Sequence, residues 1–221
     1  MKWTLYGPDA LLFQFADRVG DAAFAKGRAI VTELENHPPA GVREFVPAFT
    51  SVLLEFDPEQ IPDLRRIAPE LAARLDAASN LEIPPSPIKE IPVVYDGPDL
   101  ERVARTNQLT AKEITELHST PVYMVYALGF SPGFPYLGDL DPRLHTPRLP
   151  SPRTRVPAGS VAIGGEHTGI YTVDSPGGWN IIGHTPLKVF DLNRAKASQR
   201  DEAMFYLRHG DRVRFVPACK T

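Results

Sequence analysis

Cysteine is almost absent from this chain of 221 residues, which carries only Cys219. A single cysteine cannot form a disulfide within the chain, so the composition fits a reducing compartment. Long apolar runs are lacking too, because Gly7-Pro8-Asp9 interrupts the first one and the stretch at 122–130 is too short to span a bilayer. We therefore expect a cytoplasmic protein without a signal peptide and without a membrane partner.

An excess of charge of either sign is also missing. The formal net charge is −3, so no overall positive field favours a nucleic-acid partner, and any anion site has to be local. The sequence contains no Walker A loop, kinase glycine loop, HExxH motif or GxSxG elbow. The spacing of His118, His145, His167 and His184 matches no zinc pattern. The short motifs thus predict neither a metal site nor a nucleotide site.

Apolar periodicity in the first 80 residues predicts a small domain in which helices pack on a sheet. Segments 10–15, 41–49 and 51–56 have the pattern of strands, and segments 19–37 and 62–78 have the pattern of amphipathic helices. With one further strand, for which no bounds are predicted, these segments give the order β-β-α-β-β-α, which is typical of a two-layer α+β domain.

Proline marks the boundary between two parts of the chain. The segment IPPSPIKEIP at 83–92 has three prolines within positions 84–87 and cannot continue a helix, so it predicts a stiff linker. We expect an N-terminal α+β domain at 1–82 and a second domain at 93–221.

The second domain is predicted to be a closed barrel or sandwich, because many short strands alternate with Gly and Pro turns. Pro98 and the capping-box pattern from Thr110 to Glu113 begin two short helices. The predicted strands lie at 89–95, 121–128, 160–163, 169–173, 179–182, 187–191 and 211–216.

Glycine, proline and arginine gather in this second domain. Ten of the 16 glycines lie between positions 129 and 183, and together with proline they indicate either tight turns or a rigid, preorganised surface. Arg143, Arg148, Arg153 and Arg155 lie in the same region, and no acidic residue occurs between Arg143 and Gly165. This local excess of guanidinium groups predicts a phosphate, a carboxylate or an acidic partner protein as ligand, with solvated loop cations as the alternative.

A glycine-rich turn, Ser175-Pro-Gly-Gly178, could expose successive backbone N–H groups as an anion nest. The indole of Trp179 is expected to fill the barrel or, less readily, to stack on a substrate. A Ser-His-Asp triad is the weaker possibility, and its members would be Ser160 or Ser175, His167 or His184, and Asp174.

Several long segments, taken in order, resemble a single known family. They are YDGPDL at 95–100, LHST at 117–120, GFSPGFPYLGDLD at 129–141, PR-x4-RTRVPAGSVAIGG at 147–165, HTGIYTVDSPGGWNIIGHTP at 167–186 and GDRVRF at 210–215. On these motifs the chain is identified as a member of the KipI/PxpB family, described as the B subunit of 5-oxoprolinase or as allophanate hydrolase subunit 1.

The resemblance implies a small N-terminal α+β domain followed by a cyclophilin-like β-barrel. It also implies that the chain is one part of a three-part enzyme, in which the A, B and C subunits together open 5-oxo-L-proline to L-glutamate with hydrolysis of ATP. The B subunit is expected to be inactive alone and to share a site for a small cyclic amide with the C subunit. Contact between this chain and ATP is left open.

Opening a lactam requires activation of an unreactive amide, and the anionic species that results needs cations and preorganised N–H donors. The resemblance and the residue types together give a set of expected substrate-binding residues: Arg148, Arg153, Arg155, Ser160, His167, Tyr171, Ser175, Gly177, Gly178 and Trp179. His118 and His184 are the candidate catalytic residues.

The chain departs from the family pattern at His167, Thr172 and His184, where Gln, Pro and Arg or Lys are common. At His184 a permanent charge is replaced by one that titrates near neutrality, which leaves the preferred amide open. Two other functions stay open as well. One is a KipI-like inhibitor that binds a sensor histidine kinase, and the other is a component of a biotin-linked amide carboxyltransferase.

Overall fold

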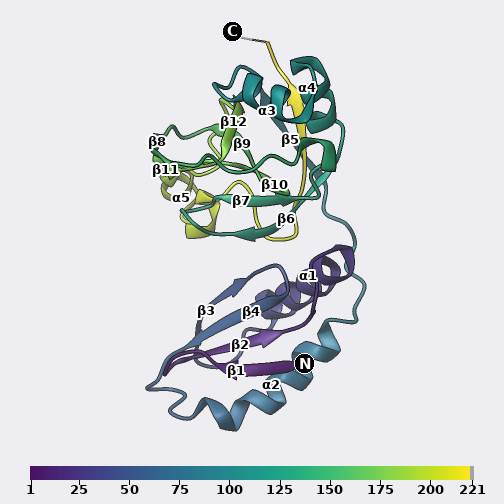
Figure 1. Cartoon of the computed structure of the whole chain (residues 1–221). Coiled ribbons are helices and arrows are strands. Elements are labelled where there is room, and N and C mark those ends of the chain that lie inside the picture. The colour runs from purple at the N-terminus through teal and green to yellow at the C-terminus, as the bar shows by residue number, and fades with distance from the viewer. Residues whose placement is uncertain (220–221) are drawn as a thin grey trace. The chain divides into compact units, whose positions relative to one another are not determined.

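The computed structural model describes residues 1–219 and divides the chain into two compact units between Pro85 and Ser86 (Figure 1). This division falls inside the segment 83–92 that the sequence predicts as a linker. The second half of that segment is already part of a strand, which begins at Ile88.

The N-terminal unit is a four-stranded antiparallel sheet in the order β1-β2-β4-β3, accompanied by two helices. Its elements are β1 (Lys2–Leu5), β2 (Ala10–Gln14), α1 (Asp21–Asn36), β3 (Val42–Pro47), β4 (Ser51–Phe56) and α2 (Leu64–Ala78). The observed order of elements agrees with the order β-β-α-β-β-α that the sequence predicts.

One face of this sheet packs against both helices. Val52, Leu54 and Phe56 alternate along β4 as buried residues, which is the two-residue period of a half-buried strand. They form one apolar core with β2 and with the buried stripes of α1 and α2. The side chain of Asp63 accepts a hydrogen bond from the backbone N–H of Arg65 and so caps the start of α2.

The second unit begins at Ser86 and contains most of the strands. Its regular elements are β5 (Ile88–Val93), α3 (Leu100–Asn107), α4 (Ala111–Ser119), β6 (Tyr123–Leu128), β7 (Pro135–Gly138), β8 (Arg153–Val156), β9 (Ser160–Gly164), β10 (His167–Ile170), β11 (Ser175–Gly177), β12 (Asn180–His184), α5 (Leu192–Ser198) and β13 (Arg212–Pro217). Two short 3-10 helices, Pro142–Leu144 and Asp201–Met204, complete it.

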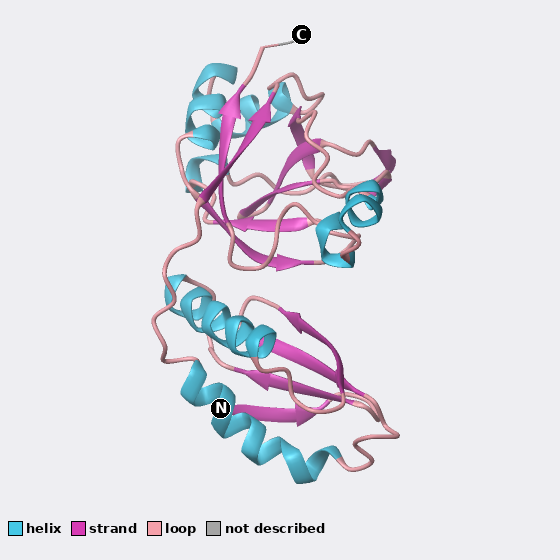
Figure 2. Cartoon of the chain, turned by 180° about the vertical axis from the view of Figure 1, so that it is seen from behind, coloured by secondary structure: helices cyan, strands magenta, loops and turns pink. Residues whose placement is uncertain are grey.

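Seven strands form one sheet in the order β12-β9-β10-β7-β6-β13-β5, and Figures 1 and 2 show it curving around a common interior. The sheet is antiparallel except for the parallel pair of β13 and β5. A bridge between Val94, just beyond β5, and His184 in β12 brings the two edges together, so the sheet is nearly closed. The predicted mixed α+β class with a C-terminal barrel is confirmed, while likeness to cyclophilin stays a prediction.

Side chains on the two faces of the barrel strands belong to two separate apolar cores. Val161 and Ile163 of β9 and Ile182 of β12 point into the barrel core, whereas Ala162 and Ile181 belong to a second cluster on the opposite side of the sheet. The alternation follows from the side-chain period of a strand. This second cluster also contains Phe134, Val156, Tyr171 and Trp179, and Val156 comes from the separate two-stranded ribbon of β8 and β11.

Some predicted elements were wrong. Segment 187–191 is not a strand and leads instead into α5, and the predicted strand 169–173 begins two residues late and ends three residues late, since β10 is His167–Ile170. Strands β7, β8 and β11 were missed. Each is only three or four residues long, and β7 and β11 contain a proline, so their backbone pairing left no periodic signal.

The closing seam of the barrel consists of residues 94–99 laid along β12. The backbone N–H groups of Val94 and His184 donate to each other's carbonyl oxygens at 2.9 Å. Further along, the N–H of Gly97 donates to the oxygen of Ile182 at 3.1 Å and that of Asp99 donates to the oxygen of Ile181 at 2.9 Å. These bonds satisfy the edge of β12 that its sheet neighbours leave open.

The close packing of the seam predicts that adding one methyl group at position 97 destabilises the protein. A Cβ at Gly97 would lie in hard contact with the carbonyl oxygen of Ile181, so Gly97→Ala should lower the free energy of unfolding by about 1–3 kcal/mol. Gly129→Ala is the matched control, because nothing lies within 4 Å of a Cβ there, and it should change stability by less than about 0.5 kcal/mol. Chemical denaturation of both variants gives the comparison, and equal stabilities would mean that the seam tolerates displacement.

Candidate functional site

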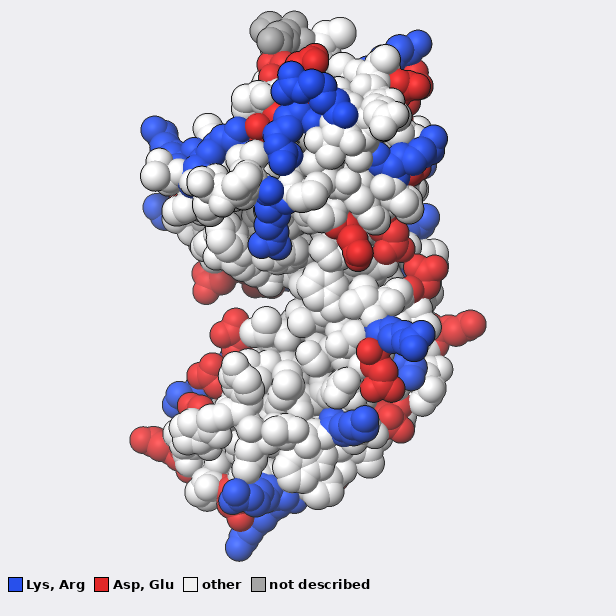
Figure 3. Space-filling model, in the orientation of Figure 1, with Lys and Arg blue, Asp and Glu red and all other residues white. Residues whose placement is uncertain are grey.

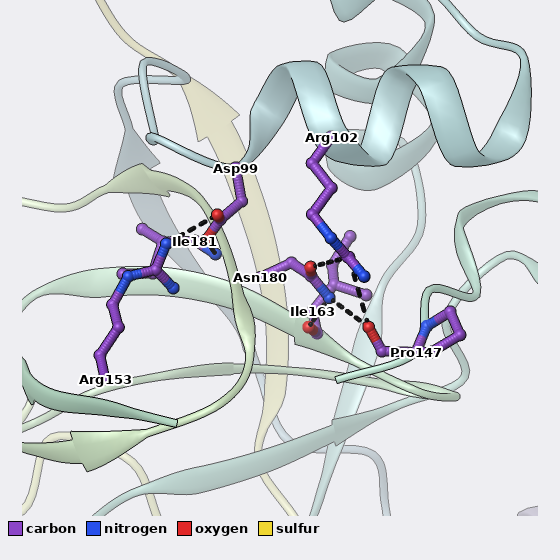
Figure 4. Close-up of polar contacts among 7 residues, drawn as sticks. All are labelled: Asp99, Arg102, Pro147, Arg153, Ile163, Asn180 and Ile181. Carbon is purple, nitrogen blue, oxygen red and sulfur yellow. Dashed lines mark hydrogen bonds and ion pairs between the residues drawn. The ribbon is translucent and has the colours of Figure 1, made fainter. Parts of the chain in front are cut away.

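A buried carboxylate lies at the end of the barrel seam. Asp99 directly precedes α3, and its side chain is only 7% exposed. One carboxylate oxygen accepts from Nη2 of Arg153 in β8 at 2.7 Å, and the other accepts from the backbone N–H of Ile181 in β12 at 2.7 Å (Figure 4). Asp99 therefore connects α3, β8 and β12, which are far apart in the sequence.

A buried amide occupies the neighbouring position of β12. Asn180 is fully buried, and its side-chain nitrogen donates to the carbonyl oxygens of Pro147 at 3.0 Å and Ile163 at 3.2 Å. Its side-chain oxygen accepts from Nη1 of Arg102 in α3, and the same Nη1 also donates to the oxygen of Pro147 at 3.4 Å (Figure 4). The guanidinium of Arg102 is thereby held by hydrogen bonds to the buried side chain of Asn180 and to the carbonyl oxygen of Pro147.

A third arginine lies over the indole of Trp179. The guanidinium carbon of Arg148 is 5.8 Å from the centroid of the ring, within the range of a cation–π contact. The indole is only 6% exposed and packs edge-on against Phe134 and Tyr136. Trp179 is thus a core residue, as expected, but it lies in the second cluster rather than inside the barrel, and one face is covered by a cation.

Arg102, Arg148 and Arg153, which we call the arginine cluster, contact or share partners with three successive residues, namely Trp179 just before β12 and the first two residues of that strand. Trp179 contacts Arg148 through its ring, Asn180 binds Arg102 through its amide, and Ile181 shares the Asp99 carboxylate with Arg153. Lys and Arg side chains run across the face of the C-terminal unit shown in Figure 3.

The charges of the cluster are only partly compensated. Arg153 forms an ion pair with Asp99, whereas within residues 1–219 neither Arg102 nor Arg148 has an ion-pair partner. The predicted local excess of four charges was too large, because acids from elsewhere reach this region. Arg143 pairs with Asp141 at 2.7 Å, and Arg155 pairs with Asp174 at 2.6 Å on the surface. Arg155 therefore lies outside the cluster.

The predicted anion nest at 175–178 is not formed. Ser175 to Gly177 adopt the extended conformation of β11 and pair with β8, and the carbonyl oxygen of Gly178 accepts from the N–H of Leu149 at 2.7 Å. A strand does not turn successive N–H groups toward one point. The hydroxyl of Ser175 is buried, and it has no hydrogen-bond partner among the described residues.

Tyr171 lies beneath this ribbon. A Cβ at Gly177 would collide with its hydroxyl, which explains why glycine is required at that position. Burial raises the pKa of the Tyr171 phenol, and the nearby positive charges of Arg148 and Arg153 oppose that rise. Tyr171 also lines a groove of about 640 Å³, formed with residues 158–159, 170–174 and 185–193 and Lys196.

Three other predicted residues are dispersed. Ser160 is buried in β9, where it pairs with His184 in the ladder. His184 is half exposed, and its Nδ1 lies 2.8 Å from a carboxylate oxygen of Asp96. His167 is partly buried, and burial lowers the pKa of its imidazole. Because Asp174 is engaged by Arg155 and by the N–H of Ala158, it does not serve as the acid of the Ser-His-Asp set.

His118 is a structural histidine, which corrects its assignment as a catalytic candidate. Its ring is fully buried and stacks on Phe215, with Nδ1 2.7 Å from the Tyr95 hydroxyl and Nε2 2.8 Å from Thr168 Oγ1. Thr168 donates to the oxygen of Ala162, so the hydrogen-bond chain requires Nε2 of His118 to donate and Nδ1 to accept. The neutral ring satisfies every partner and has no access to a substrate.

Sequence reasoning missed Asp99, Arg102 and Asn180. Asp99 stands before a helix and has the residue type of an N-cap, yet its side chain makes no cap bond and binds Arg153 instead. Arg102 carries one weak signal, since a cation in the first turn of a helix opposes the helix dipole. Asn180 lies in the predicted strand 179–182, and nothing in the local sequence shows that its amide is buried and hydrogen-bonded.

Within residues 1–219 there is no group of three or more His, Cys, Asp or Glu residues that could hold a metal ion. The same part of the chain contains no helix with both the length and the hydropathy needed to cross a bilayer.

Comparison with protein families gives a match over residues 1–199 to the sequence model described as carboxyltransferase domain, subdomain C and D. The 5-oxoprolinase B subunit of Bacillus subtilis is 37% identical over 223 residues, covering 95% of this chain and 90% of that protein. The 5-oxoprolinase B subunit of Escherichia coli O157:H7 is 55% identical over 137 residues, covering 61% of this chain and 60% of that protein.

Solved structures show the same fold. The protein TTHA0988 is 40% identical, superposes with a TM-score of 0.82, and is matched over 96% of this chain but only 40% of its own. The uncharacterized protein PH0987 of Pyrococcus horikoshii is 36% identical, with a TM-score of 0.54 over 98% of this chain and 97% of that one. The urea carboxylase of Kluyveromyces lactis, at 20% identity and a TM-score of 0.72, shares the fold over 22% of its length.

The buried state of His118 predicts a specific dependence of stability on pH. Burial lowers the pKa of the His118 imidazole from its ordinary 6.5 to about 3. Between these two pH values the imidazole is protonated in the unfolded chain and neutral in the folded chain. Stability from this group is therefore complete above about pH 6.5 and falls by about 1.4 kcal/mol per pH unit below it.

The measurement is the free energy of unfolding between pH 7 and pH 5 for the wild-type chain and for His118→Gln. The variant should be less stable at pH 7 and should show a shallower decline toward pH 5, because it lacks the titrating group. Parallel declines in the two proteins would contradict the assignment of a buried neutral imidazole.

Proposed function

Since this chain belongs to the carboxyltransferase subdomain C and D family and, within it, to the KipI/PxpB group that contains the 5-oxoprolinase B subunits, we propose that it is the B subunit of a 5-oxoprolinase. The reaction in which it takes part is the opening of 5-oxo-L-proline to L-glutamate, driven by hydrolysis of ATP. The chain contributes part of the substrate site and is inactive alone.

The observation that supports a role in binding an anion is the arginine cluster. Two of its three guanidinium groups have no carboxylate partner among the described residues, although the protein as a whole is acidic. Two uncompensated charges that contact the adjacent residues Trp179 and Asn180 repel each other, and a bound anion removes that repulsion. The hydrogen bonds that hold Arg102 in place reduce the entropy lost when such an anion binds.

The chemistry of lactam opening suits such a site. Water adds across the amide C–N bond, and negative charge develops on the former carbonyl oxygen or on a group attached to it. Fixed guanidinium groups in a partly dehydrated site stabilise that charge without having to reorganise. Arg148 is the best candidate for contact with substrate, because its guanidinium is exposed and rests on the ring of Trp179 alone among the described residues.

We assign the partners as the A and C subunits of the same enzyme, with the substrate site completed by the C subunit. Relatives are named as the B subunit of 5-oxoprolinase, which requires other subunits, and in TTHA0988 and the urea carboxylase the matched module is 40% and 22% of a longer chain. ATP is a substrate of the complex in this proposal, and no residue of this chain is assigned to it.

One alternative function has an observation in its favour. The putative urea carboxylase of Emericella nidulans is 34% identical over 123 residues, which favours a component of an amide carboxyltransferase as the second candidate. Carboxylation that depends on biotin, without glutamate release, would select this candidate. Inhibition of a sensor histidine kinase has no such support, and we do not propose it.

The proposal predicts that Arg148 matters for turnover rather than for folding. In a complex of this chain with the A and C subunits, Arg148→Gln should lower kcat/KM for 5-oxoproline at least tenfold, because a charged contact of about 1.5–3 kcal/mol is lost. The stability of the variant should change by less than about 1 kcal/mol, since only the cation–π contact is removed. Arg153→Ala is a poorer test, because it would leave the buried Asp99 unpaired.

Arg143→Gln is the matched control, because this exposed arginine pairs only with Asp141 and lies outside the cluster. Glutamate release and ATP hydrolysis are measured for the wild-type complex and for both variants. The control should stay within about twofold of wild type. A wild-type complex that releases no glutamate would remove the proposed function, and an unchanged Arg148→Gln complex would remove Arg148 from the site.

A further inference from the structure

Arginines in this protein already show how they bind a carboxylate. Arg143 donates from Nε at 3.0 Å and from Nη2 at 2.7 Å to the two carboxylate oxygens of Asp141, and Arg155 donates from Nε at 2.8 Å to one oxygen of Asp174, which also lies 2.6 Å from its Nη2 as an ion pair. Both use the side of the guanidinium on which two N–H groups point in parallel. That side matches the two oxygens of a carboxylate, and the resulting paired bonds are strong and directional.

Arg102 keeps the same side of its guanidinium free. Its hydrogen bonds to Asn180 and to the oxygen of Pro147 both come from Nη1. Nε and Nη2 have no partner among the described residues, and neither is buried, so they remain open to solvent. The group is held through its contacts to Asn180 and Pro147, which Figure 4 shows, and the edge that takes carboxylates elsewhere in the chain has no partner among the described residues.

Three features around this edge favour an anion. Arg148 follows Pro147, the residue that Arg102 contacts, and it carries a second uncompensated charge. Arg102 lies in the first turn of α3, where the N–H groups of the helix add partial positive charge. A neutral donor at this position would bind Asn180 without adding charge, so a purely structural role does not explain the guanidinium.

We propose that Arg102 and Arg148 form a subsite for the carboxylate of a small-molecule ligand. The Nε–Nη2 edge of Arg102 binds the carboxylate side-on, and Arg148 contributes a second charge from above Trp179. The choice of a cyclic amide as the rest of the ligand rests on the proposed function. With that choice, this chain recognises the carboxylate of 5-oxoproline rather than its lactam ring.

The subsite consists only of groups from this chain, so the full chain without partners has to bind the ligand. The probe is Trp179 fluorescence in a Trp3→Phe background, where Trp179 is the single tryptophan. The ligands are 5-oxoproline, the uncharged lactam 2-pyrrolidinone, and inorganic phosphate. We expect 5-oxoproline to bind at least tenfold more tightly than 2-pyrrolidinone and more tightly than phosphate.

Substitutions then test which arginine is responsible. Arg102→Gln should weaken 5-oxoproline at least tenfold and leave 2-pyrrolidinone unchanged, and Arg102→Lys should recover only part of the loss, because it restores the charge without the paired donors. Arg105→Gln is the matched control, since this exposed arginine lies on the same helix one turn later. Unfolding of each variant is followed to confirm that α3 stays docked.

Several results would overturn the subsite. They are the absence of 5-oxoproline binding, equal affinity for the uncharged lactam, equal or tighter binding of phosphate, and equal losses in Arg102→Gln and Arg105→Gln. The experiment distinguishes failure of the subsite from failure of the proposed function. Arg102-dependent binding together with a complex that releases no glutamate would refute the function alone, whereas turnover that is indifferent to Arg102 would refute the subsite alone.

Discussion

The buried carboxylate of Asp99 is the interaction on which the C-terminal unit depends. A charge that is removed from water costs several kcal/mol unless it is paired and hydrogen-bonded, and Asp99 meets both conditions with Arg153 and the N–H of Ile181. The bond to Ile181 requires the start of α3 to lie against β12, and the bond to Arg153 requires β8 to reach the same place. The same carboxylate therefore favours closure of the barrel and fixes the place of an arginine on its surface.

The remaining arginines follow from this arrangement. Once the seam is closed, α3 carries Arg102 to the buried amide of Asn180, and the loop before β8 carries Arg148 to Trp179. Two parts of the chain, α3 and the segment 148–153, thus bring guanidinium groups to three successive residues, Trp179 just before β12 and Asn180 and Ile181 within it. A site built in this way is rigid before any ligand arrives, which is the property expected of a site that stabilises developing charge.

The sequence was informative where local chemistry decides the structure. The capping box at Thr110 forms as expected, with both reciprocal bonds to Glu113, and the alternating strand 51–56 was predicted with its observed bounds. It was less informative where distant partners decide. The excess charge predicted from the absence of local acids is reduced by Asp99 and Asp174, and the glycines at 177 and 178 serve a strand pairing rather than a nest. The contact between Arg102 and Asn180 could not be predicted from the sequence, because it forms only when the seam brings α3 against β12.

Hydrogen exchange at the backbone amide of Ile181 tests the central role of Asp99 most directly, because this amide donates to the carboxylate itself. In the wild-type background, Arg153→Gln should lower the opening free energy at this amide by about 3 kcal/mol, since an unpaired charge would remain buried. In the Asp99→Asn background the same substitution should cost less than about 1 kcal/mol. Equal losses in the two backgrounds would show that Asp99 and Arg153 act independently, and the account of a carboxylate that joins barrel closure to the arginine cluster would then be wrong.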